Sequence, residues 1–168
     1  GWLRGGARAL DRVGGLAVLY GNLAPDSALV KSAAVPESMM RFTGRALCFE
    51  LMEDACEAIQ DGTVQPGCVV VIRYEGPRGG PGMREMLMPT GLLVARKLHT
   101  QCALLTDGHF SGATEGLAVG HVSPEAAAGG AIALIEDGDE IAFDVPGRRV
   151  ELLVDAATLA ARTERMRA

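Results

Sequence analysis

The sequence predicts one α/β domain, spanning residues 1–168, in which a mixed, barrel-like β-sheet is flanked by helices. Three observations support this architecture. Short apolar segments rich in β-branched residues are separated by Gly, Pro, Asn and Asp, as expected of short strands joined by tight turns. Other segments place their apolar residues at helical spacing. The two kinds of segment follow one another in mixed order, which favours a layered mixed sheet or barrel over a doubly wound fold.

Strands are expected wherever a short apolar run is bounded by turn residues. These segments are Gly15–Gly21, Ala28–Ala33, Arg45–Glu50, Gly67–Gly76, Cys102–Gly108, Gly116–Val122 and three within Ala131–Val154. The fourth contains four consecutive β-branched residues, Val69 to Ile72, and such a run predicts a strand that is buried on both faces.

Helices are expected in four segments with helical spacing or capping signals. They are Met52–Gly62, Met83–Lys97, Ser123–Gly129 and Asp155–Ala168. Pro89 and Gly91 are expected to interrupt the second helix. Ser123 and Asp155 are the expected N-caps of the third and fourth helices, and Glu125 would favour the dipole of the third.

Charge and hydropathy exclude several classes of function. The net charge is -5, which argues against a nucleic-acid surface or a polybasic membrane patch. No apolar run approaches the ~18–20 residues that a membrane span needs, and "GWLRGGARAL" does not resemble a signal peptide. The chain opens with Gly1, so we expect a segment cut from a longer, cytoplasmic protein.

The four cysteines do not follow a metal-binding pattern. Cys48, Cys56, Cys68 and Cys102 are widely and unevenly spaced, unlike zinc or iron–sulfur ligands. Most of them stand among apolar residues. They are therefore expected to be free thiols in a reducing compartment.

The first candidate site is the loop from Tyr74 to Glu85, between a buried strand and an expected helix. Gly and Pro fill every position of "GPRGGPG" except Arg78, so backbone N–H groups could face an anion there. Glu85 has two interpretations. An acidic residue in a first helical turn is usually only favourable with the helix dipole. It could also be an oxygen ligand for a hard divalent cation, and the spacing does not decide between these interpretations.

The second candidate site is Asp107–Thr114, where the strand "CALLT" runs into Asp-Gly-His-Phe-Ser-Gly. Functional residues often lie at the carboxyl ends of buried strands. His109 could be a base beside Ser111, although the segment lacks the Gly-x-Ser-x-Gly elbow. The alternative is an ordinary turn in which Ser111 caps a short helix and Asp107 stabilises the bend. Residue types alone favour the ordinary turn, and His121 is expected to be a packing residue.

Several long blocks, in the right order, resemble the C-terminal domain of the dihydroxy-acid dehydratase family, which includes sugar-acid dehydratases. They are "GNLAPDSALVKSA", "ESMMRFTGRALCFE", "VVVIRYEGPRGGPGMREML", "ALLTDGHFSGATEGLAVGHVSPEAAAGG" and "IALIEDGDEI". The resemblance covers nearly the whole chain. It implies a swivelling β/β/α-type domain, which is a barrel-like mixed sheet packed with helices.

The resemblance also implies an activity, cofactors and partners. Family enzymes dehydrate a 2,3-dihydroxy acid to a 2-keto acid with an iron–sulfur cluster and a divalent cation, usually Mg²⁺. The cluster cysteines and most metal ligands belong to a larger N-terminal domain, which is expected to be absent from this chain. The isolated domain is therefore expected to be inactive, and the full-length enzyme to form a homodimer.

Particular residues match the family's functional positions. The resemblance implies that Glu85 in "GMRE" is a ligand of Mg²⁺ and that Ser111 in "DGHFSG" takes the C2 proton of the substrate. Gly112 and Thr114 would hold the substrate carboxylate, with Asp107 and His109 as neighbours of the site. We expect Glu85 and Ser111 to approach one another, because each follows a buried strand and parallel neighbours would bring both to one edge.

The chain departs from the family pattern at two places, and both bear on the substrate. The usual "GRFSG" is "GHFSG" here, with His109 in place of Arg, and "SPTS" is "MPTG" at Met88–Gly91. The loop "YEGPRGGPGM" favours 2,3-dihydroxyisovalerate, a precursor of branched-chain amino acids. The alternatives are a sugar acid as substrate, or a binding module that kept the fold without the chemistry.

Overall fold

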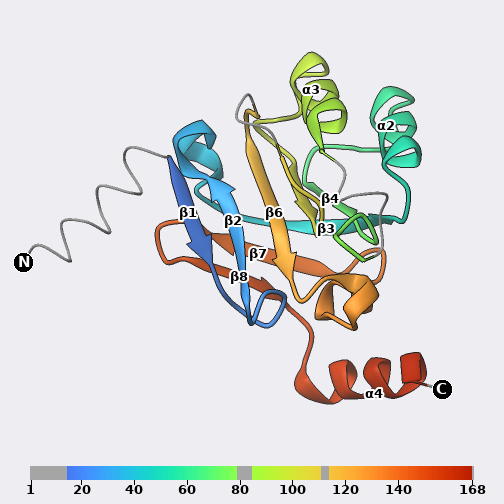
Figure 1. The fold of residues 1–168 in the computed structure, drawn as a ribbon. Coiled ribbons are helices and arrows are strands. Elements are labelled where there is room, and N and C mark those ends of the chain that lie inside the picture. The colour runs from blue at the N-terminus through green and yellow to red at the C-terminus, as the bar shows by residue number, and fades with distance from the viewer. Residues whose placement is uncertain (1–14, 79–84, 111–113, 168) are drawn as a thin grey trace, which may run out of the picture.

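The computed structural model describes residues 15–78, 85–110 and 114–167 (Figure 1). The β-strands of these residues are β1 (Leu16–Leu19), β2 (Ser27–Lys31), β3 (Arg41–Phe49), β4 (Cys68–Ile72), β5 (Ala103–Thr106), β6 (Leu117–Ser123), β7 (Glu140–Asp144) and β8 (Arg149–Leu152). The α-helices are α2 (Met52–Gln60), α3 (Leu87–Ala95) and α4 (Ala156–Arg167). Short 3-10 helices are η1 (Ser32–Ala34), η2 (Glu37–Met39), η3 (Ala126–Ala128) and η4 (Ala131–Leu134).

The strands form a single sheet in the order β1-β2-β6-β5-β4-β3-β7-β8. Its centre, from β6 to β3, is parallel, and antiparallel strands flank it on both sides. The two outer strands meet at a bridge between Tyr20 and Arg149, where the Tyr20 N–H donates to the Arg148 carbonyl at 3.0 Å. The sheet is therefore a nearly closed barrel, which confirms the predicted fold class.

Successive side chains of the central strands point to opposite faces of the sheet and both faces are buried, so the protein has an inner and an outer apolar core. Val69 and Val71 of β4 point into the cluster that fills the barrel, whereas Val70 and Ile72 belong to the cluster beneath α2 and α3. All four side chains are fully buried, as the run of β-branched residues predicts. The two helices lie together over one side of the sheet (Figure 1).

Helix α2 agrees with its sequence pattern. Its buried residues, Ala55, Cys56, Ala58 and Ile59, form one face against the sheet. The helix ends before Gly62, whose φ of +87° is a backbone conformation that glycine adopts without strain.

Helix α3 differs from the prediction at both its start and its middle. It begins at Leu87 and not at Met83, and it runs without a break through Pro89 and Gly91. Pro89 is its third residue, and a proline is tolerated there because the first N–H groups of a helix have no intrahelical acceptor. The interruption predicted at these two residues is therefore wrong.

The segment after β6 also differs from the prediction. Ser123 is not a helix N-cap, because its backbone is still paired with Ser27 in the sheet. The short helix η3 begins at Ala126 and has no side-chain cap. The expected strand at Ala131 is instead η4, and its shape follows from Arg73, whose guanidinium donates to the carbonyls of Ile132, Ala133 and Ile135. These contacts join residues about 60 positions apart in the sequence, so a local sequence pattern does not reveal them.

Helix α4 begins after Asp155, as predicted, because the Asp155 carboxylate accepts the N–H of Thr158 at 2.7 Å. Most of the helix is exposed, and Arg162 is its buried residue. The Arg162 guanidinium pairs with both carboxylate oxygens of Asp139, at 2.6 and 3.1 Å. Burial acts to raise the pKa of Asp139, but the hydrogen bonds and charge of Arg162, together with the Glu136 N–H, hold that pKa below its ordinary value.

The first prediction tests how closely Gly130, at the start of η4, packs against Pro124. A Cβ at Gly130 would overlap the carbonyl oxygen of Pro124, although the backbone φ of -66° suits any residue. Gly130→Ala is therefore expected to lower the free energy of unfolding by about 1–3 kcal/mol through overpacking. Denaturant unfolding of the 168-residue chain measures this.

Gly91→Ala is the matched control, because a Cβ there meets open space on α3. It should raise the free energy of unfolding by about 0.5–1 kcal/mol, since alanine is the better helix former. Equal effects of the two substitutions would contradict the packing that we describe for Gly130.

Candidate functional site

The carboxyl ends of β4 and β5 form the edge at which the candidate residues lie. The two strands are parallel neighbours, with Val69 opposite Ala103 and Ile72 opposite Thr106. Beyond them, Glu85 and His109 form a parallel bridge, and the Met86 N–H donates to the His109 carbonyl at 2.7 Å. The chain thus brings Glu85 beside the segment that leads to Ser111. Ser111 and Gly112 themselves lie outside the described residues.

Glu85 does not occupy a first helical turn, and that expectation is wrong. Its backbone is extended by the bridge to His109, and α3 starts two residues later. The helix-dipole interpretation of Glu85 therefore loses its basis. The side chain is exposed, so its carboxylate can reach a ligand or a group on another domain.

Asp107 is a buried anchor of this edge. Its side chain is 1% exposed, and one carboxylate oxygen accepts the N–H groups of Tyr74 at 3.1 Å and Ala126 at 2.9 Å. The other oxygen accepts the N–H of Glu75 at 3.0 Å. Three charge-assisted hydrogen bonds join the end of β5 to the turn after β4 and to η3. Asp107 thus lies among the site residues, and its oxygens hold backbone in place.

Glu125 anchors the Gly/Pro loop in the same way, and the sequence argument missed this role. Both of its carboxylate oxygens accept the N–H of Arg78, at 3.0 and 2.9 Å. Gly76 packs directly against this carboxylate, and a Cβ there would overlap it. Glu125 does stand at the N-terminus of η3, but its carboxylate makes no cap hydrogen bond there and instead accepts the N–H of Arg78, 47 positions away. The one local signal is Gly76, where only a glycine fits.

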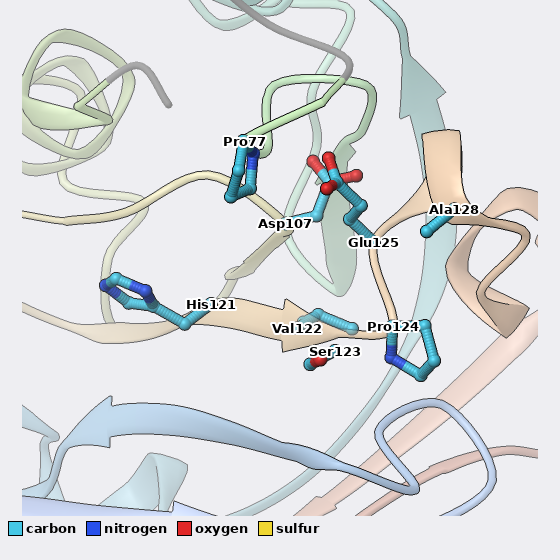
Figure 2. A pocket seen from close by; sticks show the side chains of 8 residues that line it. All are labelled: Pro77, Asp107, His121, Val122, Ser123, Pro124, Glu125 and Ala128. Atoms are coloured by element: carbon cyan, nitrogen blue, oxygen red, sulfur yellow. The ribbon is translucent and has the colours of Figure 1, made fainter. Parts of the chain in front are cut away.

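Both carboxylates face a pocket of about 300 Å³ at this edge (Figure 2). Its lining residues are Pro77, Asp107, His121, Val122, Ser123, Pro124, Glu125 and Ala128. In Figure 2 the carboxylates of Asp107 and Glu125 lie together near Pro77, while His121 lies at the opposite end. Two carboxylates stand at one end of the pocket and an imidazole at the other, so its two ends differ in chemistry.

His121 lies on a bulged part of β6 and is surrounded by rings. Its backbone φ is +53°, and its backbone N–H donates to the Gly108 carbonyl at 2.7 Å. The His109 ring lies 5.9 Å away between centroids, and the Phe110 ring meets it edge-on at 6.3 Å. Burial, with a smaller effect from the charge of His109, lowers the pKa of His121 below its ordinary value. His121 is packed, as predicted, and it also lines the pocket.

Thr114 has a buried hydroxyl at the far side of the undescribed 111–113 segment. The residue is 2% exposed, and its Oγ1 has no hydrogen-bond partner in the part of the chain that the structure describes. A role of Thr114 in binding a substrate carboxylate stays a prediction.

The cysteines are free thiols in varied surroundings. Cys56 and Cys102 are buried, and burial raises the pKa of Cys48 to about 12. Among residues 15–78, 85–110 and 114–167, no three His, Cys, Asp or Glu side chains gather as a set that could hold a metal ion. Glu85 is therefore considered below as a single ligand.

The family model described as dihydroxy-acid/6-phosphogluconate dehydratase C-terminal matches residues 2–168. The chain belongs to this family. Its members are dehydratases, which are hydro-lyases. The resemblance of the sequence blocks is thereby confirmed for the chain as a whole. In this dehydratase domain, no helix of the described residues is long and apolar enough to cross a membrane.

The second prediction concerns Asp107. Asp107→Asn replaces one acceptor oxygen by an NH₂ group and leaves buried N–H groups without acceptors. It should lower the free energy of unfolding by roughly 2–4 kcal/mol, because such groups lose hydrogen bonds to a charge. It should also increase hydrogen exchange at the amides of Tyr74 and Ala126.

Asp26→Asn is the control, because this carboxylate is exposed and only the backbone N–H of Asp26 is bonded, to Ser123. Its effect on stability should stay below about 0.5 kcal/mol. Unchanged exchange at Tyr74 and Ala126 in Asp107→Asn would show that the carboxylate does not hold these segments.

Proposed function

We propose that this domain supplies one wall of the active site of a dehydratase that converts a 2,3-dihydroxy acid to a 2-keto acid. The observation that carries the proposal is the bridge between Glu85 and His109, which lies two residues before Ser111. An exposed carboxylate thus stands beside the segment that would hold the base. The family assignment limits the reaction to dehydration.

The proposed chemistry divides the work between two residues of this chain. Ser111 takes the proton from C2 of the substrate as the C3–O bond breaks and the C2=C3 double bond forms, and this proton joins the departing hydroxide to give water. The resulting enol tautomerises to the 2-keto acid. A serine hydroxyl is a poor base at its ordinary pKa, so it needs positive charge nearby to act as an alkoxide.

Glu85 fits a place in a magnesium site. Mg²⁺ prefers oxygen ligands and commonly uses one or two carboxylates together with water and substrate oxygens. Glu85 offers one exposed carboxylate at the edge of the sheet. When bound, Mg²⁺ would hold the substrate carboxylate and C2 hydroxyl, acidify the C2 proton and supply the charge that Ser111 needs.

The cysteines of this chain do not fit an iron–sulfur cluster. A cluster needs several thiolates close together. Cys56 lies on the buried face of α2, and the raised pKa of Cys48 opposes thiolate formation. The cluster ligands of the proposed enzyme therefore come from a second, N-terminal domain, and no step here depends on thiols of this chain.

The surface next to Glu85 supports such a partner domain. Leu87 and Met88 at the start of α3 are 49% and 62% exposed. Large apolar side chains in this position are typical of a surface that another domain covers. We propose that the N-terminal domain packs here and closes the site, in a cytoplasmic enzyme that forms a homodimer.

2,3-Dihydroxyisovalerate is the proposed substrate. The loop "YEGPRGGPGM", which favours this substrate within the family, is the ground for the choice. A sugar acid is the alternative, because the chain departs from the family pattern at His109 and at Met88–Gly91. Relative kcat/KM values for the two acids distinguish these candidates.

The third prediction concerns Ser111 in the complete enzyme. Ser111→Ala should lower kcat by ~10²–10⁴-fold, as loss of a general base typically does, while KM changes little. Exchange of the substrate C2 hydrogen is the most direct measurement. A wild-type rate of C2–H cleavage in Ser111→Ala would mean that another group is the base, and His109 would be the next to test.

The fourth prediction concerns Glu85 in the same enzyme. Glu85→Gln should weaken Mg²⁺ binding by at least the ~10–100-fold that loss of a supporting residue costs at metal sites. Substrate binding should weaken with it, because the metal holds the substrate. Titration with Mn²⁺, followed by electron paramagnetic resonance, measures the affinity directly.

Glu164→Gln is the control, since Glu164 is an exposed carboxylate on α4, which lies at the other end of the molecule from α3 (Figure 1). It should leave Mn²⁺ affinity unchanged. If Glu85→Gln bound Mn²⁺ as tightly as the wild-type enzyme, Glu85 would not be a metal ligand.

A further inference from the structure

Arg73 is a half-buried cation without a carboxylate partner among the residues that the structure describes. It follows β4 directly, and one terminal nitrogen of its guanidinium donates to three carbonyls around η4, at 2.7–3.3 Å. No carboxylate of the described residues forms an ion pair with it. Its Nε–H is buried and has no acceptor within the described part of the chain.

Arg162 on α4 also has a buried Nε–H without an acceptor among the described residues, although its other nitrogens are paired. The residue is 8% exposed, and its terminal nitrogens are satisfied by Asp139 and by the Leu134 carbonyl. Glu136 lies 3.4 Å from it as a second carboxylate.

The two arginines line one pocket of about 300 Å³ between η4 and α4. Glu136, Arg165 and Met166 form other parts of its wall. This pocket shares no lining residue with the pocket of Figure 2. Figure 1 shows α4 below the turns that follow β6, so the pocket lies where the terminal helix meets the barrel.

The charges of this pocket favour an anion. Three guanidinium groups and the carboxylate of Glu136 line it. Arg165 and Arg162 both lie within 3.4 Å of Glu136, and Arg162 also pairs with Asp139, so two carboxylates stand against three cations and one positive charge remains in excess. Buried donors without acceptors are costly, and two such charged donors belong to arginines that line this pocket. Arginine also matches phosphate and carboxylate geometry better than other cations do.

We propose that Arg73, Arg162 and Arg165 form a binding site for a small oxyanion, either a phosphate or a carboxylate group. The ligand would accept hydrogen bonds from the arginines and join α4 to the end of β4. Because Arg73 is followed by the turn that Asp107 holds, occupancy of the site would also stabilise that turn. The inference does not depend on the proposed dehydratase chemistry.

Arginine Nε–H resonances of the 168-residue chain provide the test. Inorganic phosphate and acetate are titrated separately, with sodium chloride holding the ionic strength constant. We expect the Nε–H signals of Arg73 and Arg162 to shift saturably with at least one anion, with a Kd on the order of 1 mM. Saturation by one anion alone identifies the preferred oxyanion, and either result supports the site.

Met166→Glu places a carboxylate in the wall of the pocket, where it would compete with the bound anion, because Met166 lines the pocket and is 51% exposed. It should weaken anion binding by roughly tenfold or more through like-charge repulsion. Met166→Gln is the matched neutral control and should bind as the wild-type chain does. Unsaturable shifts, parallel shifts of all arginines, or equal binding by the two variants would overturn the proposal.

Discussion

The candidate site depends on the buried carboxylate of Asp107 and the three backbone N–H groups that it accepts. This group joins β5 to the turn after β4 and to the start of η3, which are distant in sequence. Glu125 repeats the arrangement by accepting the N–H of Arg78. The turn at Gly76–Arg78 is thus held by hydrogen bonds to its backbone. Gly76 and Pro77 therefore need no polar side chain to fix its conformation.

In the barrel, the apolar packing residues and the polar residues of the candidate site occupy different places. Apolar residues fill its interior and the space beneath α2 and α3, while the polar groups of the candidate site stand where the parallel strands end. This placement follows from strand direction, since parallel neighbours end at the same edge. Glu85 joins that edge through a single bridge to His109, so its position depends on the backbone and not on a helix.

Sequence patterns predicted the elements whose causes are local. The run from Val69 to Ile72 marked a strand buried on both faces, and Asp155 marked the start of α4. The patterns failed where a distant partner decides the conformation, as at η4, which Arg73 shapes. The site was harder still, because residue types alone favoured ordinary turns, and only the family resemblance pointed to Glu85 and Ser111. The anchoring role of Glu125 depends on a contact across 47 positions, which a local pattern cannot show.

Closure of the barrel has a consequence for how this domain meets other chains. A sheet with free edges can be extended by a strand from a partner, or by a second copy in aggregation. Here the outer strands β1 and β8 are joined at Tyr20 and Arg149, and Asn22 exchanges hydrogen bonds with Leu152 beside them. Strand addition at that seam would have to displace these bonds. Contact with another domain through the side chains of helices and loops would leave these bonds, and with them the barrel, intact.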